Sequence, residues 1–166
     1  MLATQNLSRA GVRYEEKFVT LQETTQKNMA KIAVDFDGTI VEHEYPKIGK
    51  EIPFATETLR MLLAENHKLI LWTVREGELL DEAIEWCRQR GVTFYAVNAD
   101  HPDDDLDKGH HFTRKLKVDY FIDDRNIGGL PDWGQIYRII HEHKSYADLI
   151  REQNGEGSKK KHWWSR

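Results

Sequence analysis

Hydrophobic and polar positions along the middle of the chain follow two different periodicities. Short apolar runs occur at residues 31–36 ("KIAVDF"), 68–73 ("KLILWT"), 92–98 ("VTFYAVN") and 118–124 ("VDYFIDD"). Apolar residues at helical spacing occupy residues 54–67, 76–91, 132–143 and 145–153. Short apolar runs separated by amphipathic segments predict strands connected by helices. The pattern therefore predicts an α/β fold: a three-layer, Rossmann-like parallel sheet with helices on both faces.

Two of the predicted helices, 54–67 and 76–91, have a clear apolar face, and Gly91 is placed to end the second one. We expect these side chains to point into the core: Phe54, Leu59, Leu62 and Leu63 from the first helix, and Leu80, Ala83, Ile84 and Cys87 from the second.

The two ends of the chain differ from the middle. Residues 1–28 are polar and rich in Gln, Thr and Glu, which predicts an extension that is disordered or loosely helical. Residues 151–166 end in a Gly, Ser and Lys-rich stretch, which predicts a flexible tail. A single folded domain is expected between them, at residues 29–150.

Composition narrows the class of protein. A net charge of −4 gives no general attraction to nucleic acid or acidic lipid. The single cysteine, Cys87, excludes a disulfide within the chain and favours a reducing compartment. Since the chain has neither an apolar run of about 20 residues nor the apolar middle of a secretory signal, we expect a cytoplasmic protein without membrane contact.

Polar side chains collect where the predicted strands end. Because right-handed crossovers bring these ends to one edge of a parallel sheet, the side chains should meet there. They are Asp35 and Asp37, Thr73 and Arg75, Asn98 and Asp100, and Asp123 and Asp124, with Lys115 just before the last strand. Converging carboxylates are costly unless a cation neutralises them, and oxygen ligands suit Mg²⁺. The alternative is that each aspartate caps a helix or shapes a turn.

The two aspartates of "DFDGT" suit different roles. Asp35 lies within the strand, so a rigidly held carboxylate there is suited to be a nucleophile. Asp37 lies on the turn that bends at Gly38, where a mobile carboxyl group is suited to general acid and base work. Thr73 and Lys115 would hold the oxygens of a phosphoryl group. Arg75 is either a further contact for the anion or the partner of a surface acid.

Four motifs, "DFDGT", "WT", Lys115 and "FIDD", resemble those of the haloacid dehalogenase superfamily in order and spacing, over roughly residues 30 to 145. The resemblance implies that Asp35 forms a phosphoaspartate and that Asp37 is the acid and base, with its backbone carbonyl on Mg²⁺. It further implies roles for four more residues: phosphate binding by Thr73 and Lys115, and metal binding by Asp123 and Asp124. Lys117 remains an alternative to Lys115.

An aspartate in the second position of the first motif is typical of the phosphatases of this superfamily, so the resemblance implies a Mg²⁺-dependent phosphomonoester hydrolase. Residues 40–55 leave room for only a short flap, which implies a member without a cap domain. Members without a cap act on large substrates or have their site covered by another subunit. Two questions therefore stay open: whether the protein is a homo-oligomer, and whether its substrate is a small molecule or a macromolecule. His43 is a candidate contact of the leaving group. The loop 100–111 is expected to be a solvated loop with capping aspartates, and a lid beside the site or a second metal site are its alternatives.

Three other interpretations stay open. "TVRE" after the second strand is similar to polynucleotide 3′-phosphatases, although the negative net charge does not favour a nucleic-acid substrate. A receiver-like domain also carries a phosphorylated aspartate, but there it ends the third strand, where this chain has Asn98. A binding module without catalysis would keep the site for a metal or a phosphorylated partner.

Overall fold

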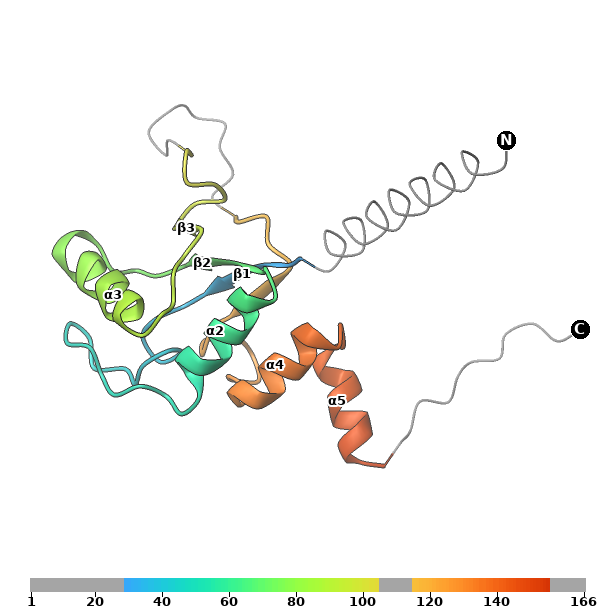
Figure 1. The fold of residues 1–166 in the computed structure, drawn as a ribbon. Helices are drawn as coiled ribbons and strands as arrows, with labels where there is room; N and C mark the ends of the chain where they lie inside the picture. The colour runs from blue at the N-terminus through green and yellow to red at the C-terminus, as the bar shows by residue number, and fades with distance from the viewer. Residues whose placement is uncertain (1–28, 105–114, 156–166) are drawn as a thin grey trace, which may run out of the picture.

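A computed structural model of the chain describes residues 29–104 and 115–155 (Figure 1). Its elements are β1 (Lys31–Val34), α2 (Ala55–Ala64), β2 (Lys68–Leu71), α3 (Gly77–Gln89), β3 (Ala96–Val97), β4 (Tyr120–Ile122), α4 (Trp133–His141) and α5 (Tyr146–Gln153). The order and type of these elements match the prediction, although every strand is shorter than predicted. Of the helices in the two described ranges, none is long and apolar enough to cross a membrane. The predicted extension 1–28 and residues 156–166 of the predicted tail lie outside the described residues.

The four strands form one sheet in the order β3-β2-β1-β4, and every neighbouring pair is parallel (Figure 1). Val34 of β1 is in register with Leu71 of β2 and with Ile122 of β4, and Leu71 is in register with Val97 of β3. The carboxyl ends of all four strands therefore lie at one edge. The predicted parallel α/β sheet is confirmed.

The core lies mainly on one face of the sheet. Successive strand residues point to opposite faces, so Ile32 and Val34 face one cluster and Ala33 faces another. The larger cluster also contains the buried residues of three helices: Ala55, Leu59 and Leu62 of α2, Ala83 and Cys87 of α3, and Trp133, Ile136 and Ile140 of α4. The smaller cluster joins Ala33 to Ile70, Ala96 and Leu116. Both faces of the central strands are thus buried, as the apolar runs predicted.

The structure can be compared with the predicted buried residues of α2 and with the predicted end of α3. Leu59 and Leu62 are fully buried, but Phe54 is 68% exposed. Phe54 adopts a left-handed conformation just before α2 (φ 69°), so its side chain leaves the helical face, and the prediction that it is buried is wrong. The predicted end of α3 is confirmed, because Gly91 (φ 76°) takes the left-handed conformation two residues after Gln89.

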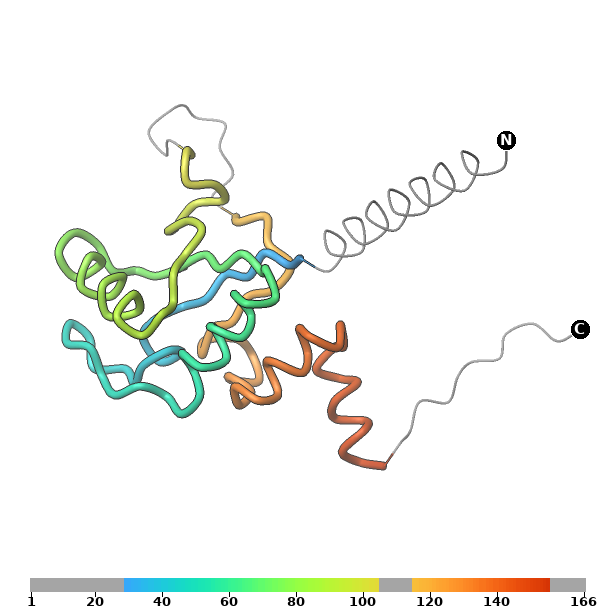
Figure 2. The backbone as a smooth tube through the Cα atoms, viewed as in Figure 1, coloured from blue at the N-terminus to red at the C-terminus, as the bar shows by residue number. Residues whose placement is uncertain are grey.

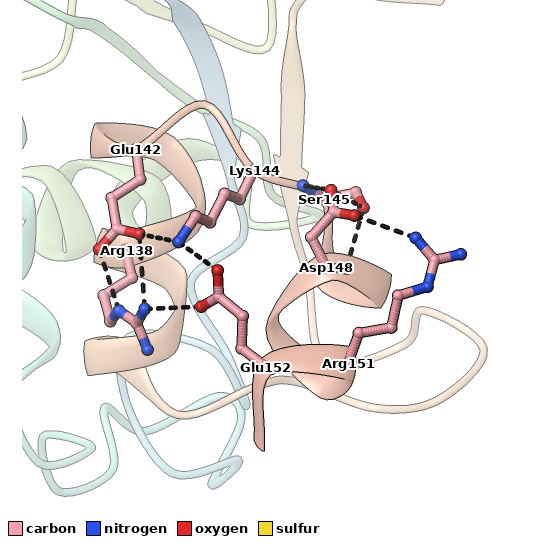
Figure 3. Close-up of polar contacts among 7 residues, drawn as sticks. All are labelled: Arg138, Glu142, Lys144, Ser145, Asp148, Arg151 and Glu152. Carbon is pink, nitrogen blue, oxygen red and sulfur yellow. Dashed lines mark hydrogen bonds and ion pairs between the residues drawn. The ribbon is translucent and has the colours of Figure 1, made fainter. Parts of the chain in front are cut away.

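Helix α5 packs on α4. Figure 3 shows the ion pairs that link α5 to α4 and to the residues just after it. Leu149 is its fully buried side chain. Glu152 accepts from Arg138 at 3.1 Å and from Lys144 at 2.6 Å, and these two cations also bind Glu142. Exposed pairs of this kind contribute little each, so Leu149 is the main anchor. Helix α5 continues to Gln153, three residues beyond the predicted end of the domain at residue 150.

The connection from β1 to α2 contains a short closed loop, visible in Figure 2 beyond the end of β1. Val41 and Glu51 form an antiparallel bridge, and the Glu42 amide donates to the Lys50 carbonyl at 2.7 Å. Residues 42–50, called the flap below, therefore form a loop whose two ends are hydrogen-bonded to each other. Its size matches the short flap expected in this part of the sequence.

Candidate functional site

Three carboxylates meet at the edge where the strands end. Asp35 directly follows β1, while Asp123 and Asp124 directly follow β4. Because β1 and β4 are parallel neighbours in register, one ligand oxygen from each of the three carboxylates lies within 4.8 Å of the others. All three side chains are half-buried. The structure thus brings together three of the predicted metal ligands, from positions far apart in the sequence.

Thr39 joins the two halves of this cluster. Its hydroxyl donates to Asp35 Oδ2 at 3.3 Å and accepts from the backbone N–H of Asp124 at 3.0 Å. Its carbonyl accepts from the indole N–H of Trp133 at 3.3 Å, and the residue is fully buried. No role for Thr39 is predicted from the sequence. A hydroxyl directly after the bend of "DFDGT" was the available signal.

Gly38 allows Asp124 to approach the end of β1. Its φ of 91° lies in the left-handed region that side chains disfavour. A Cβ at this position would lie 2.5 Å from Asp124 Oδ2 and 2.8 Å from Asp124 Cγ, which is closer than nonbonded atoms approach. Gly38 is therefore required both by the turn and by the position of Asp124.

The electrostatics of the cluster favour a bound cation. Burial raises the pKa of Asp35 from 3.8 to about 6; the Phe36 N–H opposes this rise, and the carboxylates of Asp123, Asp124 and Asp37 add to it. Within the described residues, Asp124 Oδ1 is the buried side-chain oxygen that lacks a hydrogen-bond partner. A buried carboxylate oxygen without a donor is costly, and a cation bound there would remove that cost. The donor set, all hard oxygens, fits Mg²⁺.

Asp37 is held apart from the other three carboxylates. Both of its oxygens accept from Arg75, Oδ2 from Nε and Oδ1 from Nη2, each at 2.7 Å. Asp37 is 5% exposed and Arg75 is fully buried. The sequence predicts a mobile Asp37 and an Arg75 that contacts an anion, whereas in this structure the two side chains bind each other. Nδ1 of His43, in the flap, lies 3.5 Å from the Asp37 carbonyl oxygen.

Thr73 follows β2 and is oriented by Asn98, which follows β3. The Thr73 N–H donates to Asn98 Oδ1 at 2.8 Å, and Asn98 Nδ2 donates back to the Thr73 carbonyl at 2.9 Å. Asn98 itself adopts a left-handed conformation (φ 50°). The Thr73 hydroxyl accepts from the Arg75 N–H at 3.2 Å, so Thr73 lies beside the Asp37–Arg75 pair. Asn98 is thus a positioning residue that the sequence analysis placed at the edge without a role.

The structure describes Lys115 and only part of the predicted acidic loop. Lys115 is exposed at the start of the second described range, and its role stays a prediction. Lys117 is also exposed, and its N–H donates to Asp100 Oδ1 at 2.7 Å. Residues 105–111 of the predicted lid or second metal site lie outside the described residues. In the described part of that loop, the His101 N–H donates to Asp104, which closes a turn.

The fold and the site define an α/β protein with a parallel four-stranded sheet and an acidic cluster at its carboxyl edge. The chain is 65% identical to a conserved protein of Bacteroides thetaiotaomicron of known structure, with a TM-score of 0.67, and the match covers 73% of this chain and 97% of that one. The chain therefore belongs to the same family as that protein. That relative is described only as a conserved protein, so the match carries no activity to this chain. No family model and no curated protein matches the chain.

Proposed function

We propose that the protein is a Mg²⁺-dependent phosphomonoester hydrolase of the haloacid dehalogenase type. The observation that carries the proposal is the cluster of Asp35, Asp123 and Asp124 with the unpartnered, buried Oδ1 of Asp124. Turn formation accounts for Asp123, whose Oδ1 accepts from the Arg125 N–H at 2.8 Å. It does not explain the buried Oδ1 of Asp124, which has no donor among the described residues.

Asp35, Asp123 and Asp124 would hold the metal, together with the backbone carbonyl of Asp37. A bound Mg²⁺ supplies positive charge that offsets the three carboxylates and polarises a phosphoryl group. The hydrogen bonds from Thr39 and from the Phe36 N–H fix the orientation of Asp35, so this chain supplies a nucleophile that is already positioned.

In the proposed reaction, a carboxylate oxygen of Asp35 attacks phosphorus and the bond from phosphorus to the leaving oxygen breaks. Asp37 gives its proton to that oxygen, so the product leaves as an alcohol. Water then attacks the phosphoaspartate and returns a proton to Asp37, which releases phosphate and regenerates Asp35. Thr73 and Lys115 bind the oxygens of the phosphoryl group, and Arg75 is a further candidate for that role.

The same proposal includes the layers of the fold, the substrate, the location and the oligomeric state. The fold would be three-layered, without a cap domain. Its substrate would be a phosphorylated small molecule or the phosphorylated end of a macromolecule. The net charge of −4 does not favour the polynucleotide 3′-phosphatase alternative. A cytoplasmic location and a homo-oligomer that covers the site fit the same proposal.

The test is hydrolysis of p-nitrophenyl phosphate with and without Mg²⁺ by the wild type and the Asp35→Asn variant. We expect Mg²⁺-dependent multiple turnover by the wild type and a loss of about 1,000-fold or more in the variant, because the nucleophile is removed. Asp81→Asn, which changes an exposed carboxylate in α3, should keep full activity.

Three outcomes would contradict the proposal. Full activity of Asp35→Asn would exclude the phosphoaspartate route. Release of a single equivalent of phosphate per chain would favour the receiver-like alternative, and no turnover of any phosphoester in a broad panel would favour a binding module without catalysis.

A further inference from the structure

Arg75 connects the proposed acid to the flap. Besides its two bonds to Asp37, its Nη1 donates to the Pro46 carbonyl at 3.1 Å and its Nη2 donates to the Lys47 carbonyl at 2.9 Å. One guanidinium therefore binds both oxygens of the Asp37 carboxylate and two consecutive backbone carbonyls of the flap. The planar fork of arginine matches this set of acceptors, which a lysine would not satisfy.

The surroundings of Arg75 hold it in this position. Its guanidinium carbon lies 5.0 Å from the centre of the Phe36 ring and 5.4 Å from that of the Tyr45 ring. Phe36 lies between the two aspartates of the first motif, and Tyr45 belongs to the flap. The side chain is fully buried, so its charge depends on Asp37 and the flap carbonyls for compensation. Moving Arg75 would therefore remove a donor from the Asp37 carboxylate and from two flap carbonyls at the same time.

We propose that Arg75 is a positioning residue that holds the carboxyl group of Asp37 and the flap as one unit, and through it controls proton transfer to the leaving group. The inference rests on the proposed phosphatase function. In that reaction Asp37 must reach the leaving oxygen, and in this structure both of its oxygens are bound to Arg75. Presentation of Asp37 to the substrate is therefore coupled to the position of residues 46 and 47.

The leaving group of the substrate provides the decisive test. p-Nitrophenolate leaves without a proton, whereas the alkoxide of β-glycerophosphate needs one. Because Asp37 also receives a proton when the phosphoaspartate is hydrolysed, a step common to both substrates, the comparison uses kcat/KM, which reports formation of the phosphoaspartate. For Arg75→Met we expect kcat/KM to fall about 100-fold with β-glycerophosphate and less than about 3-fold with p-nitrophenyl phosphate. Asp37→Asn should show the same pattern. The double variant Arg75→Met/Asp37→Asn should lose no more activity than Asp37→Asn alone, because the two substitutions remove the same function. Arg75→Lys should recover part of the loss.

A second readout does not require activity. Hydrogen exchange of the amides in residues 42–50 should be faster in Arg75→Met than in the wild type, while exchange in β1 and β2 should not change. Arg90→Met is the matched control. Arg90 stacks on Trp86 and pairs with Glu51 at 3.6 Å, beside the base of the flap. Among the described residues, these contacts involve neither Asp37 nor the carbonyls of residues 46 and 47. This variant should leave both the flap exchange and the leaving-group pattern unchanged.

The outcomes separate the inference from the proposed function. Equal losses with both substrates, or a rise in KM alone, would make Arg75 a phosphate ligand or a purely structural residue and would overturn the inference while the phosphatase stands. Unchanged flap exchange in Arg75→Met would overturn the coupling to the flap. If the wild type hydrolyses neither substrate, the proposed function fails, and the role in proton transfer fails with it.

Discussion

At the scale of single residues, Gly38 tests whether the geometry of the acidic cluster matters. Gly38→Ala would place a methyl group 2.5 Å from Asp124 Oδ2 and impose a left-handed conformation on alanine. We expect a loss of about 2 to 3 kcal/mol in the free energy of unfolding, together with loss of the stabilisation by Mg²⁺, because Asp124 must move away from Asp35. Urea unfolding with and without Mg²⁺ measures both effects.

Gly129→Ala is the matched control for that variant. Gly129 also has a left-handed backbone (φ 78°), but no atom lies within 4 Å of the position its Cβ would take. It should therefore cost only the backbone strain, about 1 kcal/mol, and keep the response to Mg²⁺. Equal effects of the two variants on Mg²⁺ binding would show that the close approach of Asp124 to Gly38 is unimportant.

Single residues also differ in how well their place in the site could be predicted from the sequence. Asp35, Asp123 and Asp124 could be placed together, because the ends of parallel strands share an edge whatever the side chains are. The pairing of Asp37 with Arg75 could not be placed in the same way. This pair joins positions 38 residues apart. The direction of the long Arg75 side chain depends on its packing against Phe36 and the flap.

At the scale of elements, His67 links the starts of the two central strands and gives the fold a pH dependence. Its Nδ1 accepts from the Ala30 N–H at 2.9 Å, so the bound form is a neutral imidazole with its proton on Nε2, which faces Glu65 at 3.5 Å. Burial lowers the pKa of His67 below 6.5, although Glu65 opposes this. The unfolded chain therefore binds a proton that the folded chain resists, and stability falls as the pH drops below about 6.5.

We expect the wild type to lose about 1 kcal/mol more than His67→Gln between pH 7 and pH 5, since glutamine does not titrate and its amide oxygen can accept the Ala30 N–H. Urea unfolding at both pH values measures this difference. His43→Gln, which changes an exposed histidine, should behave as the wild type. The same loss in His67→Gln and the wild type would exclude His67 as the source of the pH dependence.

Element boundaries were predicted less well than element order, for a physical reason. The apolar run of residues 92–98 predicts a strand of that length, but only Ala96–Val97 pairs with β2. Tyr95 and Asn98 each donate a backbone hydrogen bond to β2, at Leu69 and Leu71, just outside the strand. Apolar content reports burial, whereas strand length depends on how many residues pair with a neighbouring strand. Among the described strands, β3 lies at the edge and pairs only with β2, through Ala96 and Val97.

At the scale of the whole molecule, the acidic cluster should lower the stability of the metal-free protein. Asp35 is ionised above its raised pKa of about 6, at a half-buried position beside two other carboxylates. Asp35→Asn removes that charge and keeps an oxygen to accept from Thr39. We therefore expect the variant to be more stable than the wild type at pH 7.5 with a chelator present, by about 1 to 2 kcal/mol after allowing for solvent screening.

Mg²⁺ should reverse this order. At a concentration 100 times its Kd, a ligand that binds only the folded state adds about 2.7 kcal/mol, so the wild type should gain more than Asp35→Asn, which lacks one ligand. Urea unfolding of the two proteins, with chelator and then with excess Mg²⁺, gives all four values, and Asp81→Asn shows the effect of removing an exposed carboxylate. A metal-free Asp35→Asn less stable than the wild type would mean that Asp35 contributes to the fold through its hydrogen bonds more than its charge costs. The cluster would then be a structural feature, and the case for a metal site would depend on Asp124 alone.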